Sequence, residues 1–225
     1  MIDLDIQLCI GDAPDERQRY IADGPIDFAS WLQMATDIDT ELVRGVVVDR
    51  MAVQYPHESL FAWLMSVLGI FVSHQKLGVV LGSRTAVKIG ANDGRLPDLL
   101  FVRADNLAII HRDAIYGVPD LVIEIISPND RPSDLISLEA DYCALGVPEI
   151  LFLDPKKQRV RYLRKRAVEK ADIAGVMTGD YEASYLTSGP LTSVSIPGFQ
   201  IKVEWLFTDE RPDEFTVVKE LIEQR

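Results

Sequence analysis

The segment Pro119-Asp-Leu-Val-Ile-Glu-Ile-Ile126 constrains the fold of this chain more than any other. It is short, β-branched and almost continuously apolar, which is typical of a strand that other elements cover on both faces. A helix is expected next, from about Ser133 to Leu145 and ended by Gly146, and then a strand at 149–154. This order predicts a right-handed crossover that makes the two strands parallel.

Glu124 is the most informative single residue, because it interrupts that apolar run. A glutamate is rarely placed in such a strand without a partner. A bound metal ion is one possible partner and an arginine is another, so a functional acid and a structural ion pair both remain open.

Asp98 repeats the pattern inside Leu96-Pro-Asp-Leu-Leu-Phe-Val102. A lone aspartate there is more often a turn or cap residue, but two isolated acids in two buried strands weaken that interpretation. Magnesium is held by one or two carboxylates plus waters and substrate oxygens, and phosphodiester cleavage uses such a cation. Asp98 and Glu124 are therefore candidate metal ligands.

The remaining pattern predicts an α/β (α+β) fold, a mixed β-sheet flanked by helices. A short helix is expected at 27–35 with Asp27 as its cap, and apolar spacing predicts a helix from His57 to about Gln75. A last helix is expected from about Asp213. Further strands are expected at 41–50, at 83–89 and 97–102 around the turn-rich connector 90–94, at 149–154, and at 159–164.

The length of 225 residues suits one large domain, and about half of the residues are hydrophobic. We divide the chain into an N-terminal extension (1–26), the main domain (27–207), and a C-terminal acidic segment with a helix (208–225).

Cys9 and Cys143 match no zinc or disulfide pattern, which indicates a reducing compartment. The N-terminus lacks the basic region of a signal peptide, and Leu60–Val72 is too short to cross a bilayer. A cytoplasmic protein without membrane contact is expected.

The net charge of −12 disfavours non-specific coating of nucleic acid but permits a local basic groove. Residues 156–166 contain seven basic residues and no acid. Within them, Lys156, Lys157, Arg159 and Arg161 are candidate phosphate contacts. The simpler alternative is a solvated edge hairpin, whose charges prevent edge-to-edge aggregation.

Several of these segments together resemble one family. They are Leu96-Pro-Asp-Leu-Leu-Phe-Val102, Pro119-Asp-Leu-Val-Ile-Glu-Ile-Ile-Ser-Pro128, Tyr142 followed by Gly146-Val-Pro-Glu149, Asp154-Pro155, Glu41-Leu-Val-Arg-Gly45 and the stretch from Leu191 to Phe207. The family is the bacterial putative restriction endonuclease family of the PD-(D/E)xK nuclease superfamily, and the resemblance covers about residues 27–207.

The resemblance implies a restriction-endonuclease-like fold and a DNA endonuclease that uses Mg²⁺ (or Mn²⁺) held by Asp98 and Glu124. It also implies Glu41 as an additional acid, for which an exposed charge at a strand start is the simpler interpretation. By the same analogy we expect a homodimer, because cutting duplex DNA needs two active sites. The family often has a histidine near His57; a polar residue near a helix terminus is the alternative.

The chain departs from the family at its lysine. The superfamily expects a lysine two residues after the second acid, where Ile126 stands, and this family places it four residues before the tyrosine, where Leu138 stands. Leu138 lies on an apolar helical stripe and is interpreted as a core residue. Arg131 or Lys88 could supply the missing charge.

This departure leaves several functions open. The first is a magnesium-dependent DNA endonuclease with impaired phosphodiester hydrolysis. The second is a catalytically inactive nuclease-fold protein that binds nucleic acid or a protein partner, and the third is an acidic structural module without metal affinity.

Overall fold

The fold was obtained as a computed structural model, which describes residues 7–9, 19–21, 24–34, 40–50, 54–82, 84–128, 130–166 and 180–223. For 7–9 and 19–21 only the backbone is described. Most of the expected N-terminal extension therefore lies outside the described residues.

A six-stranded mixed sheet forms the centre of the molecule, in the order β12-β11-β10-β9-β8-β5. Strands β9 and β10 are parallel and the other neighbours are antiparallel. The strands are β5 (Gly78–Gly82), β8 (Leu99–Arg103), β9 (Leu121–Ile125), β10 (Glu149–Asp154), β11 (Arg159–Lys165) and β12 (Tyr181–Leu186). The β9–β10 pair, joined by a helix, confirms the parallel pairing expected from the sequence.

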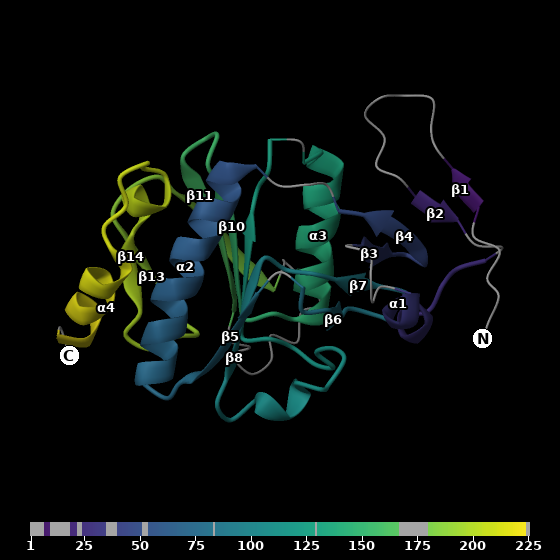
Figure 1. The fold of residues 1–225 in the computed structure, drawn as a ribbon, viewed down its shortest axis with the longest axis horizontal. Coiled ribbons are helices and arrows are strands. Elements are labelled where there is room, and N and C mark those ends of the chain that lie inside the picture. The colour runs from purple at the N-terminus through teal and green to yellow at the C-terminus, as the bar shows by residue number, and fades with distance from the viewer. Residues whose placement is uncertain are drawn as a thin grey trace, which may run out of the picture.

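Two long helices cover opposite faces of this sheet, α2 (Tyr55–His74) and α3 (Pro132–Leu145) (Figure 1). Because side chains alternate along a strand, Leu121, Ile123 and Ile125 of β9 join the core cluster that contains the α2 residues. Val122 joins the other cluster, which contains Tyr142 of α3. The continuous apolar run of β9 is explained by this double burial.

Helix α2 is long and apolar enough to pass a length-and-composition test for a membrane span, as core helices can. Eight of its side chains are buried, among them Trp63 and Phe71. Helix α4 (Glu214–Glu223) packs on it through Val217, Val218 and Leu221, so the C-terminal segment shares the same core. Asp213 Oδ1 accepts a hydrogen bond from the Thr216 backbone N–H at 3.0 Å and thereby caps α4 where its start was expected.

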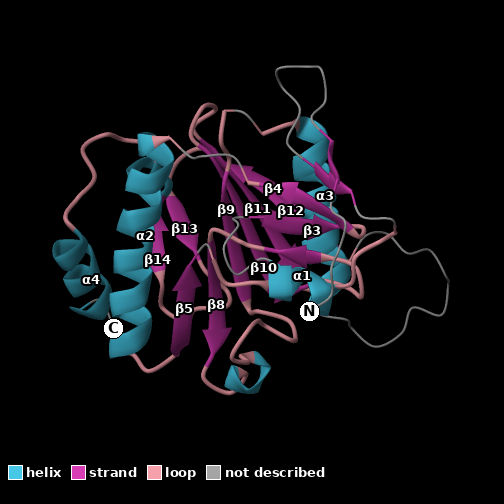
Figure 2. Ribbon diagram, turned by 45° about the vertical axis from the view of Figure 1, so that its right-hand side comes forward, coloured by secondary structure: helices cyan, strands magenta, loops and turns pink. Residues whose placement is uncertain are grey.

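A second sheet, of short strands in the order β1-β2-β4-β3-β7-β6, lies beside α3 (Figure 2). Helix α1 (Phe28–Met34) packs on it, and Asp27 caps this helix as expected, accepting the Ser30 N–H at 2.8 Å. The strands are β1 (Gln7–Cys9), β2 (Arg19–Ile21), β3 (Thr40–Val43), β4 (Val46–Asp49), β6 (Val87–Lys88) and β7 (Gly94–Arg95). Strands β13 (Pro190–Thr192) and β14 (Gln200–Lys202) form a separate hairpin.

Two expectations about strands were wrong. Residues 41–50 form a hairpin of β3 and β4 instead of one strand, because Arg44 and Gly45 both adopt positive φ, at 51° and 77°, as a tight hairpin turn requires. The connector 90–94 joins β6 to β7 within the small sheet, whereas β8 pairs with β5 and β9 in the main sheet. Strand β5 was not anticipated.

Candidate active site

The two acids singled out from the sequence lie opposite each other on neighbouring strands. Strands β8 and β9 are antiparallel with Leu99 paired to Ile123, and the same register continued by one residue places Asp98 opposite Glu124. Directly opposite residues point to the same face and have Cβ atoms about 4.5–5.5 Å apart. Both acids are buried, at 2% and 7% exposure. The fold therefore brings together two carboxylates that are 26 positions apart in the sequence.

Asp98 is held in its ionised form by donors from three different segments. Its Oδ2 accepts the Ile125 backbone N–H at 2.8 Å and lies 3.2 Å from His57 Nε2, while its Oδ1 accepts Arg50 Nη2 at 3.1 Å. Burial by itself would raise the pKa of Asp98, but the hydrogen bond and charge of His57, the charge of Arg50 and the Ile125 N–H together lower it.

The pKa of Glu124 is shifted in the opposite direction to that of Asp98. Burial and the negative charge of Asp98 raise the pKa of Glu124 well above its ordinary value, and Glu41 adds to this effect. The Tyr142 hydroxyl donates a hydrogen bond to Glu124 Oε1 at 2.5 Å and offsets part of the rise. Burial and the charge of Glu124 also raise the pKa of Tyr142 well above its usual value, so this hydroxyl remains a donor. Two facing acids with oppositely shifted pKa values are typical of a functional site.

Glu149 provides a contrast within the same sheet. It is fully buried on β10, and its carboxylate accepts hydrogen bonds from the Tyr162 and Ser193 hydroxyls and from the Val194 and Ser195 backbone N–H groups. These four neutral donors satisfy it and fix the loop before β14. Burial of an acid in this protein is thus not by itself a sign of function; what distinguishes Asp98 and Glu124 is that they face each other.

Glu41 lies beside this pair but is bound to an arginine. Its Oε2 is 2.9 Å from Arg95 Nη1, and its side chain is 12% exposed, so it is not an exposed charge at a strand start. The Arg95 guanidinium also contacts Asp141 and Ser137 of α3. Burial opposes the charge of Arg95, but the two acids raise its pKa above its already high value. Arg95 therefore links β3, β7 and α3 next to the site.

The two positions where a lysine was expected lie on the same side of the sheet as Tyr142. Ile126 and Leu138 both pack against the core cluster on the α3 side of the sheet, the cluster that contains Tyr142. Leu138 is half-buried there, in agreement with its interpretation as a core residue. Aliphatic side chains thus stand at both positions where the family resemblance places an ammonium group.

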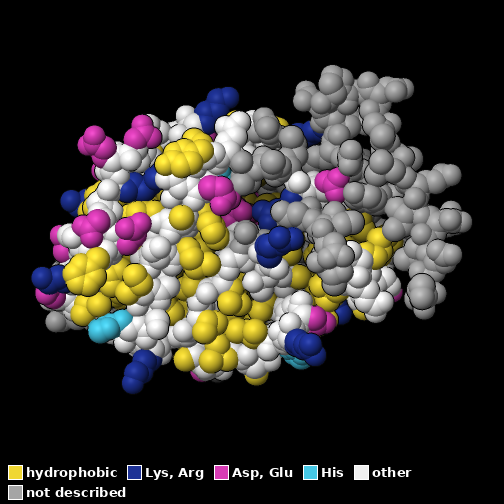
Figure 3. Space-filling view, in the orientation of Figure 1, with side chains coloured by type: hydrophobic (Ala, Val, Ile, Leu, Met, Phe, Trp, Pro, Cys, Tyr) yellow, Lys and Arg dark blue, Asp and Glu magenta, His cyan; other side chains and the backbone are white. Residues whose placement is uncertain are grey.

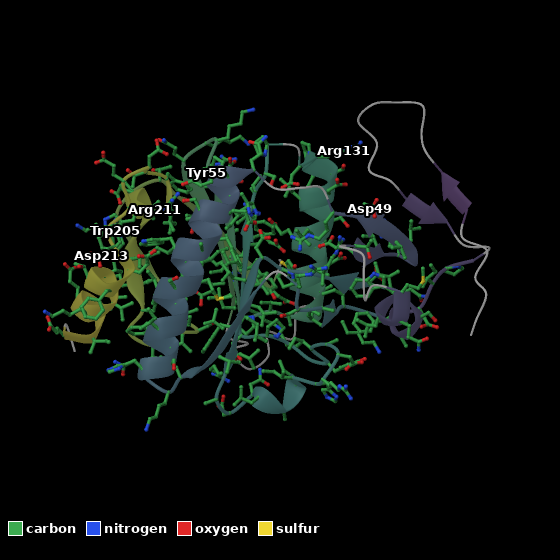
Figure 4. The ribbon with its side chains drawn as sticks, in the orientation of Figure 1. Asp49, Tyr55, Arg131, Trp205, Arg211 and Asp213 are labelled. Carbon is green, nitrogen blue, oxygen red and sulfur yellow. The ribbon has the colours of Figure 1, made fainter. Side chains whose placement is uncertain are left out.

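The two substitute cations named from the sequence are placed differently. Lys88 extends its ammonium over the rings of Phe28 and Tyr116, at 5.7 and 5.6 Å, in the small sheet and away from the acid pair. Arg131 is the residue that precedes α3, and Figure 4 shows it at the start of that helix.

The four basic residues expected to contact phosphate line one pocket of about 850 Å³. The pocket lies between the start of α3 and β11, and His57 and Ile126 line its wall as well, which connects it to the acid pair. Arg161 makes a bidentate ion pair with Glu139 at 2.6 and 2.7 Å, and Arg159 lies over the Tyr185 ring at 4.2 Å. The set is Lys156, Lys157, Arg159 and Arg161.

The comparisons with known proteins concern the family and the fold of this chain. The family model described as "Putative restriction endonuclease" (Uma2) matches residues 26–203. The chain belongs to this family. A solved structure of a putative nuclease belonging to DUF820 from Anabaena variabilis ATCC 29413 is similar to it, with a TM-score of 0.58 and 16% sequence identity, over 88% of this chain and 99% of that one. At this identity the likeness shows the fold. Comparison with curated proteins gave no match.

Sequence reasoning missed two site residues of this family member, Arg50 and Arg95. Neither stands in an unusual pattern, and their partners are 42 to 54 positions away. His57 was considered mainly as a polar residue near a helix terminus, whereas its ring lies against Asp98. The resemblance to the family was the one signal that pointed to His57, and it also singled out Tyr142.

Proposed function

We propose that this chain is a metal-dependent nuclease that hydrolyses phosphodiester bonds of DNA at the Asp98–Glu124 pair. The observation that carries the proposal is the register of β8 and β9, which sets the two carboxylates opposite each other. Membership of a family described as putative restriction endonuclease supports the same reaction class.

Asp98 and Glu124 fit a hard divalent cation such as Mg²⁺ or Mn²⁺. Among the described residues no group of three or more His, Cys, Asp or Glu side chains has the arrangement of a metal site. Magnesium, however, needs only one or two carboxylates, with water and substrate oxygens completing its shell. A cation shared by the pair would also offset the repulsion that raises the pKa of Glu124. When bound, it would supply charge neutralisation at the phosphate and activation of water.

The chain's own residues prepare this site in three ways. The Ile125 N–H and His57 fix the orientation of Asp98, so its Oδ1 can be presented to a cation. The Tyr142 hydroxyl fixes Oε1 of Glu124. The pocket lined by Lys156, Lys157, Arg159 and Arg161 offers positive charge for the phosphate backbone of the substrate, partly offset by Glu139 and Asp154, which also line it.

Cleavage of supercoiled plasmid DNA tests the proposal. We expect weak nicking that requires Mg²⁺ or Mn²⁺ and is lost in Asp98→Asn, a variant that keeps the side-chain shape but removes the charge. Weak activity is expected because Ile126 and Leu138 stand at the lysine positions, and loss of one charge-stabilising group costs about 10²–10³ in rate. No metal-dependent cleavage in folded wild-type protein would contradict the proposal.

A catalytically inactive, nucleic-acid-binding protein is the second candidate, favoured by the aliphatic side chains of Ile126 and Leu138 at the lysine positions. Fluorescence anisotropy with labelled duplex DNA separates the two. Lys156→Gln with Lys157→Gln should weaken binding and lower the salt slope by about one for each phosphate that is no longer neutralised. Lys219→Gln, in the exposed pair with Glu223 on α4, is the matched control. Binding that these changes weaken, with no cleavage by wild type, would favour the second candidate.

A further inference from the structure

Among the described residues, the Arg50 guanidinium is in direct contact with the acid pair, a contact that the sequence did not suggest. Arg50 directly follows β4, and its Nη2 lies 3.1 Å from Asp98 Oδ1. The Arg50 side chain is 19% exposed and that of Asp98 is 3% exposed, so the contact is largely shielded from water but still open on one side. The charge of Arg50 also acts on Glu124, where it offsets a small part of the rise in pKa that burial and Asp98 cause. The guanidinium therefore lies within electrostatic reach of both carboxylates.

Three other basic groups of the described residues have partners outside the acid pair. Arg95 is bound between Glu41 and Asp141, and Lys88 lies over two aromatic rings. Arg161 is held in a bidentate pair by Glu139. Each would have to break several contacts to reach the acid pair, whereas Arg50 is already there.

The hydrogen bonds of Asp98 divide its two oxygens between different tasks. Oδ2 receives the Ile125 N–H and faces His57, while Oδ1 receives Arg50. A divalent cation that binds Asp98 would take Oδ1, because the donors on Oδ2 come from the rigid strand and the helix start. The Arg50 guanidinium keeps its charge at every physiological pH, so it competes with the cation for that oxygen.

We propose that Arg50 has two positions: against Asp98 Oδ1 in the metal-free protein, and on the phosphate of the bound nucleic acid when a divalent cation takes that oxygen. The planar guanidinium matches two phosphate oxygens, so Arg50 supplies there part of the positive charge that Ile126 and Leu138 cannot. This inference rests on the proposed nuclease function and names the residue that completes it.

Two measurements on one set of variants test this role. Isothermal titration with Mn²⁺, without DNA, reports the competition for Asp98; plasmid cleavage at saturating Mn²⁺ reports the contact with phosphate. Arg50→Gln should bind Mn²⁺ about tenfold more tightly, a change of about 1.4 kcal/mol. The same variant should cleave about 10²–10³-fold more slowly. Opposite changes in metal affinity and rate are not expected from a merely structural arginine.

Arg103→Gln is the matched control. Arg103 is an arginine at the far end of β8, half-exposed and paired with Asp105 and Asp120, so its loss should leave both measurements at the wild-type level. Arg50→Lys keeps the positive charge but lacks the planar guanidinium that can donate to two phosphate oxygens at once. It should bind Mn²⁺ like wild type and cleave more slowly. If Arg50→Gln does not fold, Arg50→Lys decides, and unchanged cleavage by it overturns the inference.

The outcomes also separate this inference from the proposed function. If wild type binds Mn²⁺ through Asp98 and cleaves DNA, but Arg50→Gln matches it in affinity or in rate, the role of Arg50 is wrong and the nuclease stands. If neither wild type nor Arg50→Gln binds Mn²⁺ or cleaves DNA, the proposed function fails, and the role of Arg50 with it.

Discussion

At the scale of single residues, the site combines two acids in unlike environments with cations that come from other segments. Asp98 is ionised between Arg50 and His57, whereas Glu124 faces Tyr142 and the negative charge of Asp98. The positions where the family resemblance places a lysine are aliphatic. The effect of the missing lysine on DNA cleavage can be measured by a substitution at Leu138.

Leu138→Lys should raise metal-dependent plasmid cleavage above that of wild type. Leu138 packs on the same side of the sheet as Tyr142, so the apolar stem of a lysine could follow the leucine path and carry its ammonium toward Glu124. Because Leu138 is only half-buried, we expect a stability loss of about 1–2 kcal/mol, at the low end for a core leucine. Cleavage is therefore compared on protein shown to be folded by circular dichroism.

Ile136→Lys is the control for that experiment. Ile136 is 70% exposed on the same helix and lines the pocket of the four basic residues, so this variant adds the same charge to the proposed DNA contact without directing it to the acid pair. An equal gain from both variants would mean that the added charge acts through general attraction of DNA. No gain from folded Leu138→Lys would show that position 138 does not reach the site.

Arg95→Met should lower the free energy of unfolding by about 3–5 kcal/mol, measured by urea denaturation. The change leaves the carboxylates of Glu41 and Asp141 close together and without their shared cation in a buried setting. Arg103→Met removes a half-exposed arginine that also pairs with two acids, and it should cost at most about 1 kcal/mol. Similar losses for the two variants would mean that Arg95 contributes no more than a surface ion pair.

At the scale of elements, α3 positions most of the site. It carries Tyr142 to Glu124, Asp141 to Arg95 and Glu139 to Arg161. Its C-terminal end is set by Gly146, which has φ of +88° and donates its N–H to the Tyr142 and Cys143 carbonyls. Such a left-handed cap is readily formed by glycine and costly for other residues.

Gly146→Ala should therefore lower stability by about 1–2 kcal/mol. The added Cβ would also come within 2.7 Å of Lys165 Nζ, although that flexible group can move. Gly69→Ala is the matched comparison: Gly69 lies inside α2 with nothing within 4 Å of the point that an added Cβ would occupy, so alanine should stabilise α2 by about 0.5–1 kcal/mol. In thermal unfolding, the midpoint temperature should fall for Gly146→Ala and rise for Gly69→Ala. A higher midpoint for Gly146→Ala would contradict the role of the cap.

At the scale of the whole molecule, a main sheet covered by α2 and α3 is joined by a small sheet and by the C-terminal helix α4 (Figures 1 and 2). On the face shown in Figure 3, acidic and basic side chains are interspersed around a hydrophobic area, so this face carries no extended basic surface among the described residues. The positive charge proposed to contact DNA is instead gathered in the pocket beside β11.

A homodimer remains our prediction for the assembly. A nuclease that cuts both strands of a duplex needs two active sites, and a symmetric pair of chains is the common way to provide them. Light scattering coupled to size-exclusion chromatography should give a mass near twice 25.2 kDa at high micromolar concentration. A monomer under these conditions would contradict this, and would agree with nicking of single strands.

The sequence by itself determined the main elements and the identity of the acid pair. Helices α2, α3 and α4, and strands β9, β10 and β11, follow from local periodicity, caps and apolar runs, which act over a few neighbouring residues. The isolation of Asp98 and Glu124 within apolar strands is likewise a local signal. The family resemblance added Tyr142 and His57 and showed which lysine is absent.

Only the tertiary structure decided which charges face each other. The division of the strands between two sheets depends on pairing between distant segments, and so does the contact of Arg50 with Asp98 across 48 positions. The sequence offered Lys88 as one replacement for the missing lysine. Strand register and the direction of its side chain place it over two aromatic rings instead. Electrostatic partners are chosen by distance in space, which a local sequence pattern does not contain.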